Sequence, residues 1–247
     1  MSDTFKVVIP ARFEATRLPG KLLEDIAGKP LLQHVYDSAI HSKANEVIIA
    51  TDSPQIKKAA LGFGATVVMT ADNHVSGTDR IAEAVTTLGL NDETVIVNTQ
   101  GDEYQLPSEV IDQLAAELSD NPGFQMATLC EKIKDREDIN NPGVVKVVSD
   151  VTGAALYFSR SPVPWQEYGG QGDLQLTPVF RHIGIYAYRV GFLKLYTSLA
   201  TCALEQAEKL EQLRALYNGY KIQVIQACMP CGMEINTPGD LDKARNL

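Results

Sequence analysis

The stretch FKVVIPARFEATRLPGK, residues 5–21, joins a short apolar run to a basic loop. The run FKVVI (5–9) contains three β-branched residues and stops at a proline, so it predicts a buried strand. Arg12, Arg17 and Lys21 follow within one loop that also contains a glycine. The stretch therefore predicts a strand whose carboxyl end leads directly into a concentration of positive charge.

Three more apolar runs predict strands downstream of this one. They are EVIIA (46–50), ATVVM (65–69) and TVIVN (94–98). Apolar residues recur at helical spacing between these runs, over 31–40, 55–63 and 80–90. Strands that alternate with helices form right-handed βαβ units, so the first half of the chain predicts a mostly parallel sheet.

The later part of the chain has a more antiparallel pattern. Strands are predicted over 125–133, 143–150, 154–160 and 181–189, with a hairpin turn at 151–153. Helices over about 190–200 and 204–217, a strand over 221–227 and a short C-terminal helix follow. We expect a single α/β domain over residues 1–247, in which a mostly parallel, Rossmann-like sheet has helices on both faces and a smaller antiparallel insertion at about 125–190.

The composition restricts the class of protein. The 247 residues carry a formal net charge of −9, and the pI near 5.0 argues against nucleic acid or an anionic membrane as the main partner. No apolar run approaches the ~20 residues that cross a bilayer, and the N-terminus lacks the features of a secretory signal. Four cysteines are too few and too scattered for a disulfide framework. We expect a soluble, cytoplasmic protein.

Four polar segments follow directly after predicted strands. They are PARFEATRLPGK, TDS, VSGTDR and QGDE. Ligands of parallel α/β sheets bind at the carboxyl ends of the strands, so these segments should meet at one edge. Arg12, Arg17 and Lys21 would present donors suited to phosphate oxygens there. Three solvated surface cations are the alternative, but the convergence of the four segments favours a phosphate site.

Two of these segments carry further candidates. Asp102 in QGDE is placed to hold a divalent cation that bridges phosphate oxygens; capping of a helix that starts near Pro107 is its alternative. SGTDR (76–80) suits close approach of a base or sugar, and equally suits a helix N-terminus. CMPC (228–231) lacks a second cysteine pair at zinc spacing, so we interpret it as incidental.

His34 and His182 lie in different sequence patterns, which predict different roles for them. His34 lies in a helical pattern and is expected to be structural. His182 lies beside Arg181 on an alternating strand, where a functional role and ordinary strand packing both remain open.

The chain resembles the 3-deoxy-manno-octulosonate cytidylyltransferase family, the CMP-Kdo synthetases, in an ordered series of motifs from about residue 5 to 245. The series includes VVIPARFEATRLPGK, SGTDR, QGDE, YFSR, RHIGIY and LEQLR. Single motifs are shared with other sugar nucleotidyltransferases, whereas the series is specific. The resemblance implies a nucleotidyltransferase fold with a dimerisation insertion, and hence a homodimer. It also implies condensation of CTP with an eight-carbon acidic sugar for lipopolysaccharide assembly, with release of pyrophosphate and with Mg²⁺ as cofactor.

The resemblance also implies roles for individual residues. Catalysis would rest on Arg12, Arg17, Lys21 and Asp102. The nucleotide would be bound by Ala11, Arg12, Lys21, Ser76, Gly77, Arg80 and Gln100. The sugar would be bound by Gln100, Arg160, His182, Tyr186, Glu211 and Gln212, with Arg160 and His182 as cationic or donor groups near its carboxylate. The metal would be held by Asp102 and Asn236.

This sequence departs from the family pattern at the metal site. The family has an aspartate in a V-D-T-P segment, whereas EINTP here places Asn236 at that position. An amide offers an oxygen without charge, so metal affinity should fall unless another group compensates. Glu234, two residues earlier, would lie on the same face of an extended segment and is a hypothetical substitute.

QGDEYQLP also departs from the family's usual Q-G-D-E-P-L-I-P, because Tyr104 and Gln105 add polar groups beside Asp102. Such changes would suit the branch of the family that uses the 8-amino-3,8-dideoxy form of the sugar. Two other readings stay open: a cytidylyltransferase for another acidic sugar such as a sialic acid, and a non-catalytic nucleotide-binding relative.

Overall fold

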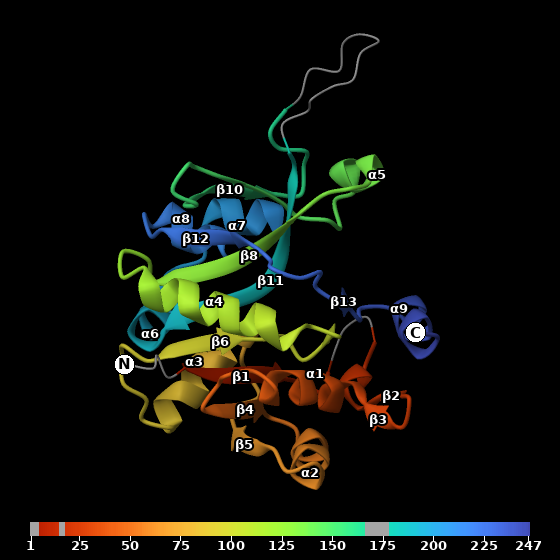
Figure 1. Cartoon of the computed structure of the whole chain (residues 1–247). Coiled ribbons are helices and arrows are strands. Elements are labelled where there is room, and N and C mark those ends of the chain that lie inside the picture. The colour runs from red at the N-terminus through yellow and green to blue at the C-terminus, as the bar shows by residue number, and fades with distance from the viewer. Residues whose placement is uncertain (1–4, 15–17, 166–177) are drawn as a thin grey trace.

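A nine-stranded mixed sheet runs through the computed structural model, which describes residues 5–14, 18–165 and 178–247 (Figure 1). The strand order is β10-β9-β11-β6-β1-β4-β5, with β8 paired to β11 and β12 paired to β8. Its strands are β1 (Phe5–Ala11), β4 (Glu46–Thr51), β5 (Thr66–Met69), β6 (Val95–Asn98), β8 (Met126–Lys132), β9 (Lys146–Ser149), β10 (Ala155–Ser159), β11 (Phe180–Arg189) and β12 (Ile222–Gln226).

The first half of the chain forms the parallel part of this sheet, as the sequence predicts. Strand β1 pairs in parallel with β4 on one side and β6 on the other, and β5 pairs in parallel with β4. Val7 and Ile9 of β1 pack into one hydrophobic cluster, whereas Val8 packs into a second cluster on the opposite face. A strand covered on both faces needs a continuous apolar run, which explains the sequence FKVVI.

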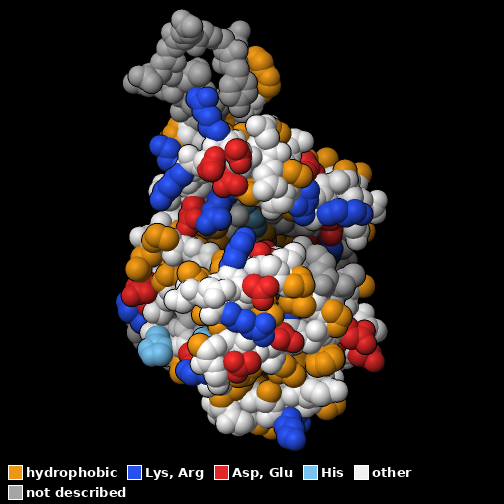
Figure 2. Space-filling model, turned by 90° about the vertical axis from the view of Figure 1, so that its right-hand side faces the viewer, with side chains coloured by type: hydrophobic (Ala, Val, Ile, Leu, Met, Phe, Trp, Pro, Cys, Tyr) orange, Lys and Arg blue, Asp and Glu red, His pale blue; other side chains and the backbone are white. Residues whose placement is uncertain are grey.

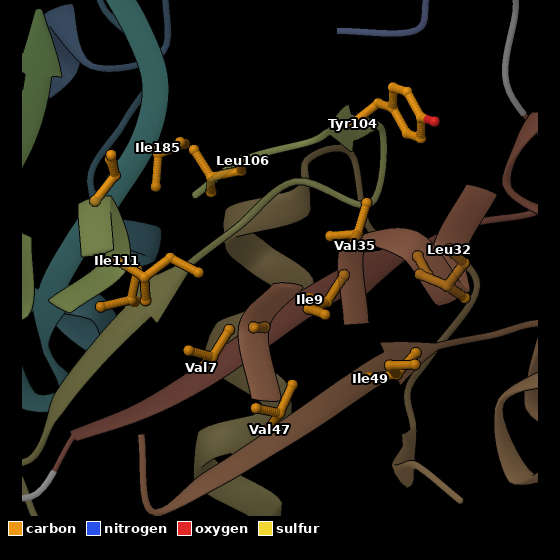
Figure 3. Packing of buried hydrophobic residues seen from close by; sticks show 14 of the residues in the cluster. Val7, Ile9, Leu32, Val35, Val47, Ile49, Tyr104, Leu106, Ile111 and Ile185 are labelled. Carbon is orange, nitrogen blue, oxygen red and sulfur yellow. The ribbon is translucent and has the colours of Figure 1, made fainter. Parts of the chain in front are cut away.

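Helices cover both faces of the sheet. Helices α1, α2 and α4 contribute to the cluster around Val7 and Ile9, and Figure 3 shows Leu32, Val35 and Ile111 among its members. Helices α3 and α6 pack on the other face, where Ile81 and Leu193 join the cluster around Val8. The bounds are α1 (Leu31–Ile40), α2 (Pro54–Gly62), α3 (Gly77–Thr87), α4 (Ser108–Asp120) and α6 (Val190–Ser198).

The second half adds the antiparallel strands. Strand β11 pairs antiparallel with β6, β8 and β9, and β9 forms the predicted hairpin with β10. Gly153 in the hairpin turn has a φ of 80°, which favours glycine. Strand β12 then pairs in parallel with β8. The predicted α/β fold is confirmed.

One predicted helix is wrong: the segment 204–217 forms two helices, α7 (Ala203–Glu208) and α8 (Leu213–Tyr217). Lys209 adopts a left-handed conformation with a φ of 55°, and this ends the first helix. Leu210 and Gln212 are buried in the connection. The break therefore turns the side chains of Leu210 and Gln212 toward the interior, while Lys209 stays exposed.

Short elements near the carboxyl ends of the parallel strands complete the described chain. Strands β7 and β13 pair as an antiparallel ribbon, as do β2 and β3. None of the described helices is long and apolar enough to cross a membrane. The bounds are η1 (Lys21–Leu23), β2 (Asp25–Ile26), β3 (Lys29–Pro30), β7 (Glu103–Tyr104), α5 (Arg136–Asn140), β13 (Met233–Glu234) and α9 (Pro238–Arg245).

Candidate active site

A cleft of about 390 Å³ lies where the carboxyl ends of β1 and β6 meet the start of α3. Figure 2 faces this side of the molecule and shows charged side chains around a hollow across its middle. Three of the four segments predicted to converge line this cleft, and the fourth, TDS, contacts it through Arg80. The cleft is lined by Pro10, Ala11, Arg12, Leu18, Lys21, Leu22, His74, Val75, Ser76, Gly77, Arg80, Gln100, Gly101, Asp102, Glu234 and Asn236.

The residues predicted for the nucleotide and the metal gather in this cleft, and those predicted for the sugar alone do not. Among the predicted residues, the cleft contains Ala11, Arg12, Lys21, Ser76, Gly77, Arg80, Gln100, Asp102 and Asn236. Arg17 lies outside the described residues. Five predicted sugar residues lie beyond the lining of this cleft as the structure describes it: Arg160, His182, Tyr186, Glu211 and Gln212.

Lys21 lies at the junction of three segments that are distant in sequence. Its ammonium group forms an ion pair with the Asp102 carboxylate and donates to the backbone oxygen of Ile235 at 2.9 Å. The side-chain oxygen of Asn236 lies 3.3 Å from the same nitrogen. Helix α4 begins after Pro107, so Asp102 is not its cap. A carboxylate, an amide oxygen and a backbone oxygen thus converge on one cation.

Asp102 is also close to two more carboxyl groups. Glu103 lies opposite Glu234 in the β7–β13 ribbon. Burial, together with the neighbouring charges of Glu234 and Asp102, raises the pKa of Glu103 to about 8. Glu103 therefore favours its neutral form at neutral pH.

Arg80 is held in a fixed orientation at the edge of the cleft. The residue is only 3% exposed, and its guanidinium donates to the Asp52 carboxylate at 2.6 Å. The same group donates to the hydroxyl of Thr70 and to the backbone oxygen of Ala71. Asp52 follows β4 in the predicted TDS segment, so this segment reaches the cleft through Arg80.

His182 and Tyr186 lie on β11 as neighbouring rings, with centroids 5.4 Å apart. The His182 Nε2 atom lies 3.0 Å from the Thr128 hydroxyl, and Phe158 packs against the ring edge-on. Desolvation of the packed ring lowers the pKa of His182 to about 3. His182 is therefore neutral at neutral pH. Of the two roles expected for it near the sugar carboxylate, hydrogen bonding fits this state and a positive charge does not.

Arg160 is anchored at the end of β10 by several backbone contacts. Its Nε donates to the backbone oxygen of Glu208 at 2.6 Å, and a terminal nitrogen donates to the backbone oxygen of Pro142 at 2.9 Å. The backbone oxygen of Arg160 accepts from the buried ammonium of Lys146 at 2.6 Å. These contacts place a guanidinium beside α7, on the antiparallel side of the sheet.

Glu211 and Gln212 lie in the connection between α7 and α8 that replaces the predicted helix. The Glu211 carboxylate accepts from the hydroxyl of Thr78 at 3.2 Å and from that of Ser76 at 3.4 Å. The Gln212 amide nitrogen is buried and has no hydrogen-bond partner among the described residues. Burial raises the pKa of the Glu211 carboxyl to about 7. Glu211 thus connects the predicted sugar residues to the first turn of α3, at the edge of the cleft.

Thr78 is a residue that the sequence interpretation missed, although it lies inside SGTDR. Ser76 caps α3 by accepting from the backbone of Asp79, so the helix-terminus and the ligand interpretations of this motif are compatible. The sequence feature that could have identified Thr78 is its position in the first turn of a helix that starts at the cleft.

The raised pKa of Glu211 predicts a pH dependence of stability. Between its ordinary value of 4.5 and about 7, the folded protein holds the proton that the unfolded chain releases. The stability from this group is therefore lost as the pH rises through that range. Without substrates, Glu211→Gln should gain about 1–3 kcal/mol relative to the wild type between pH 5 and 8. Thermal unfolding at several pH values measures this difference in stability. Glu137→Gln, at an exposed position, is the control and should show no gain over the wild type with rising pH. An equal gain in both variants would refute the raised pKa of Glu211.

Comparison with known proteins agrees with this architecture. The family model for cytidylyltransferases matches residues 6–222. The 3-deoxy-manno-octulosonate cytidylyltransferase of Francisella philomiragia is 53% identical over 98% of this chain and 97% of its own. The chain belongs to the 3-deoxy-manno-octulosonate cytidylyltransferase family. The relative from Hahella chejuensis is 50% identical with the same coverage.

A solved structure of this family has the same fold. The CMP:2-keto-3-deoxy-manno-octonic acid synthetase complexed with CTP superimposes with a TM-score of 0.91 at 38% identity, over 98% of this chain and 97% of that one. The family suggested by the ordered motifs is therefore confirmed, and this cytidylyltransferase has the sheet expected of it.

Proposed function

We propose that this protein transfers CMP from CTP to the anomeric hydroxyl of a 3-deoxy-manno-octulosonate-type sugar and releases pyrophosphate, in the cytoplasm, for lipopolysaccharide biosynthesis. The observation that carries the proposal is the Lys21–Asp102 junction at the carboxyl edge of the parallel sheet. The family's printed activity and the CTP bound in the solved relative support it.

In this proposal the basic loop binds the triphosphate. Arg12, Arg17 and Lys21 would neutralise the charge that develops as the sugar hydroxyl attacks the α-phosphorus and pyrophosphate leaves in line. Ala11, Ser76, Gly77, Arg80 and Gln100 would surround the nucleoside. The buried orientation of Arg80 supports this role, because a donor fixed before binding loses little freedom when the ligand arrives.

Mg²⁺ is proposed as the cofactor, with Asp102 and Asn236 as its protein ligands. The oxygens that converge on the Lys21 ammonium are the hard ligands that Mg²⁺ prefers, so the donor set fits. The described residues contain no group of three or more His, Cys, Asp or Glu side chains that could hold a metal ion by themselves. Mg²⁺ does not need such a group, because it commonly binds one or two carboxylates together with substrate phosphates. When bound, Mg²⁺ would supply charge stabilisation at the phosphate oxygens.

The sugar is proposed to lie between the cleft and β11. Gln100, Arg160, His182, Tyr186, Glu211 and Gln212 would bind it. The Arg160 guanidinium suits the sugar carboxylate, whereas neutral His182 and the buried amide of Gln212 suit hydroxyl groups. Glu211 links these residues to the proposed nucleotide site, because its carboxylate accepts hydrogen bonds from Ser76 and Thr78 at the start of α3.

We also propose that the chain acts as one domain and as a homodimer. The continuous sheet supports one domain with an insertion at about 125–190. The exposed Leu156 and Trp165 of the insertion support an apolar contact between two copies.

The test is pyrophosphate release with CTP and Mg²⁺, run with 3-deoxy-manno-octulosonate and separately with its 8-amino-3,8-dideoxy form. Release with the parent sugar is the expected result; a preference for the amino sugar would assign the chain to that branch. Binding of CTP without release would support a non-catalytic relative and refute the proposal. A Mg²⁺ titration of Glu234→Gln in the same assay tests the substitute ligand, which an unchanged dependence on Mg²⁺ would exclude.

A further inference from the structure

Thr78 makes a hydrogen bond that joins two distant parts of the chain. It is the second residue of α3, is only 5% exposed, and its hydroxyl donates to Oε2 of Glu211 at 3.2 Å. Glu211 lies in the connection between α7 and α8. The contact therefore holds the proposed sugar side against the helix whose start lines the nucleotide cleft.

Thr78 is the better of the two hydroxyl donors to this carboxylate. The other donor, Ser76, has one O–H group and lies 3.0 Å from the Asp79 carboxylate but 3.4 Å from Glu211. Ser76 also accepts from the backbone of Asp79 as the cap of α3. Its proton is therefore directed mainly toward Asp79, whereas the Thr78 hydroxyl, which also contacts the Tyr188 hydroxyl, is the closer of the two hydroxyls to the Glu211 carboxylate.

The backbone of Glu211 is supported separately from its carboxylate. The Tyr196 hydroxyl donates to the backbone oxygen of Glu211 at 2.6 Å. Arg214 lies over the Tyr196 ring at 5.2 Å and is paired with Glu205. The backbone of Glu211 is thus held by a contact that does not involve Thr78, whereas its carboxylate is contacted by Thr78 and Ser76.

The charged and titratable groups around Glu211 act in opposite directions. Burial raises its pKa most strongly, and the charges of Asp79 on α3 and Glu205 on α7 raise it further. The charge of Arg214 and the hydrogen bond from Thr78 lower it. The hydroxyls of three packed tyrosines face the same region, namely Tyr186, Tyr188 and Tyr196. Thr78 therefore favours the charged carboxylate as well as orienting it.

We propose that Thr78 is a positioning residue for sugar selection: its hydroxyl holds the Glu211 carboxylate toward the sugar and couples the sugar pocket to the first turn of α3. The inference rests on the proposed function, because it takes Glu211 as a group that binds the sugar. It assigns to Thr78 no contact with either substrate.

The experiment compares Thr78→Val, which keeps the shape of the side chain and removes the hydroxyl, with Thr78→Ser, which keeps the hydroxyl. For Thr78→Val we expect the KM of the sugar to rise about tenfold and the KM of CTP to stay within about twofold, because a hydrogen bond to a charged group is lost on the sugar side only. The acid limb of kcat/KM for the sugar should move to higher pH, since the carboxylate loses a donor. Thr78→Ser should restore both.

Two results would overturn the inference. One is an unchanged sugar KM and pH profile in Thr78→Val; the other is an equal rise in both KM values with a lower Tm, which a purely structural role would produce. Failure of the wild type to release pyrophosphate would instead remove the proposed function. In that case the pH dependence of Tm without substrates still tests the contact: its midpoint should move to higher pH in Thr78→Val, and an unmoved midpoint would refute it.

Discussion

Replacement of Lys21 by alanine should lower kcat about 10²–10³-fold with CTP and the sugar, the loss typical of one preorganised charge donor. The Lys21 ammonium lies among the oxygens of Asp102, Ile235 and Asn236, so it is already positioned at the end of the cleft where the acidic groups gather. In the proposed reaction it would neutralise the departing pyrophosphate. Steady-state pyrophosphate release measures the loss.

The matched control is Lys29→Ala, which also removes a lysine from an ion pair with an aspartate. Lys29 pairs with Asp37 on the surface, and its side chain is 47% exposed. Its replacement should leave kcat unchanged. Thermal unfolding of both variants separates a catalytic loss from a folding defect. If Lys21→Ala kept more than about a tenth of the wild-type kcat, Lys21 would not have the proposed role.

The parallel part of the fold and the place of the cleft were predictable because each polar segment follows a buried apolar run. The carboxyl ends of parallel strands must meet at one edge, so Arg12 and Asp102 could be placed near each other without a structure. The side-chain contacts that these residues make could not be predicted in this way. That Asp102 pairs with Lys21 and does not cap α4 depends on the path of two loops, and no periodic pattern encodes that path.

The family resemblance placed Asn236 beside Asp102, but the strand pairing that precedes Asn236 is too short to be predicted from the sequence. Strands β7 and β13 have two residues each, and alternation needs a longer run to be visible. The break between α7 and α8 was hidden for a different reason. Lys209 adopts a left-handed conformation that residues other than glycine rarely take, so the apolar pattern of 204–217 read as one helix. The contact of Glu211 with Thr78 depends on that break and was missed with it.

Replacement of Asp52 by alanine should destabilise the protein by about 3–5 kcal/mol, or roughly 10 °C in Tm. The substitution leaves the Arg80 guanidinium buried without its carboxylate partner, and the hydroxyl of Thr70 and the backbone oxygen of Ala71 do not balance its charge. Because Arg80 lines the cleft and would lose its fixed orientation, the KM of CTP should also rise about tenfold.

Asp37→Ala provides the matched control, since Asp37 forms an ion pair of the same 2.6 Å length with Lys29 at the surface. Solvent screens that pair, so its loss should cost at most about 1 kcal/mol and leave the KM of CTP unchanged. Chemical denaturation and CTP titration of the two variants give both quantities. Equal destabilisation by the two substitutions would mean that Arg80 can reach water or another acceptor when Asp52 is absent. A large loss of stability with an unchanged KM would show instead that the ion pair supports the fold without orienting Arg80 toward the nucleotide.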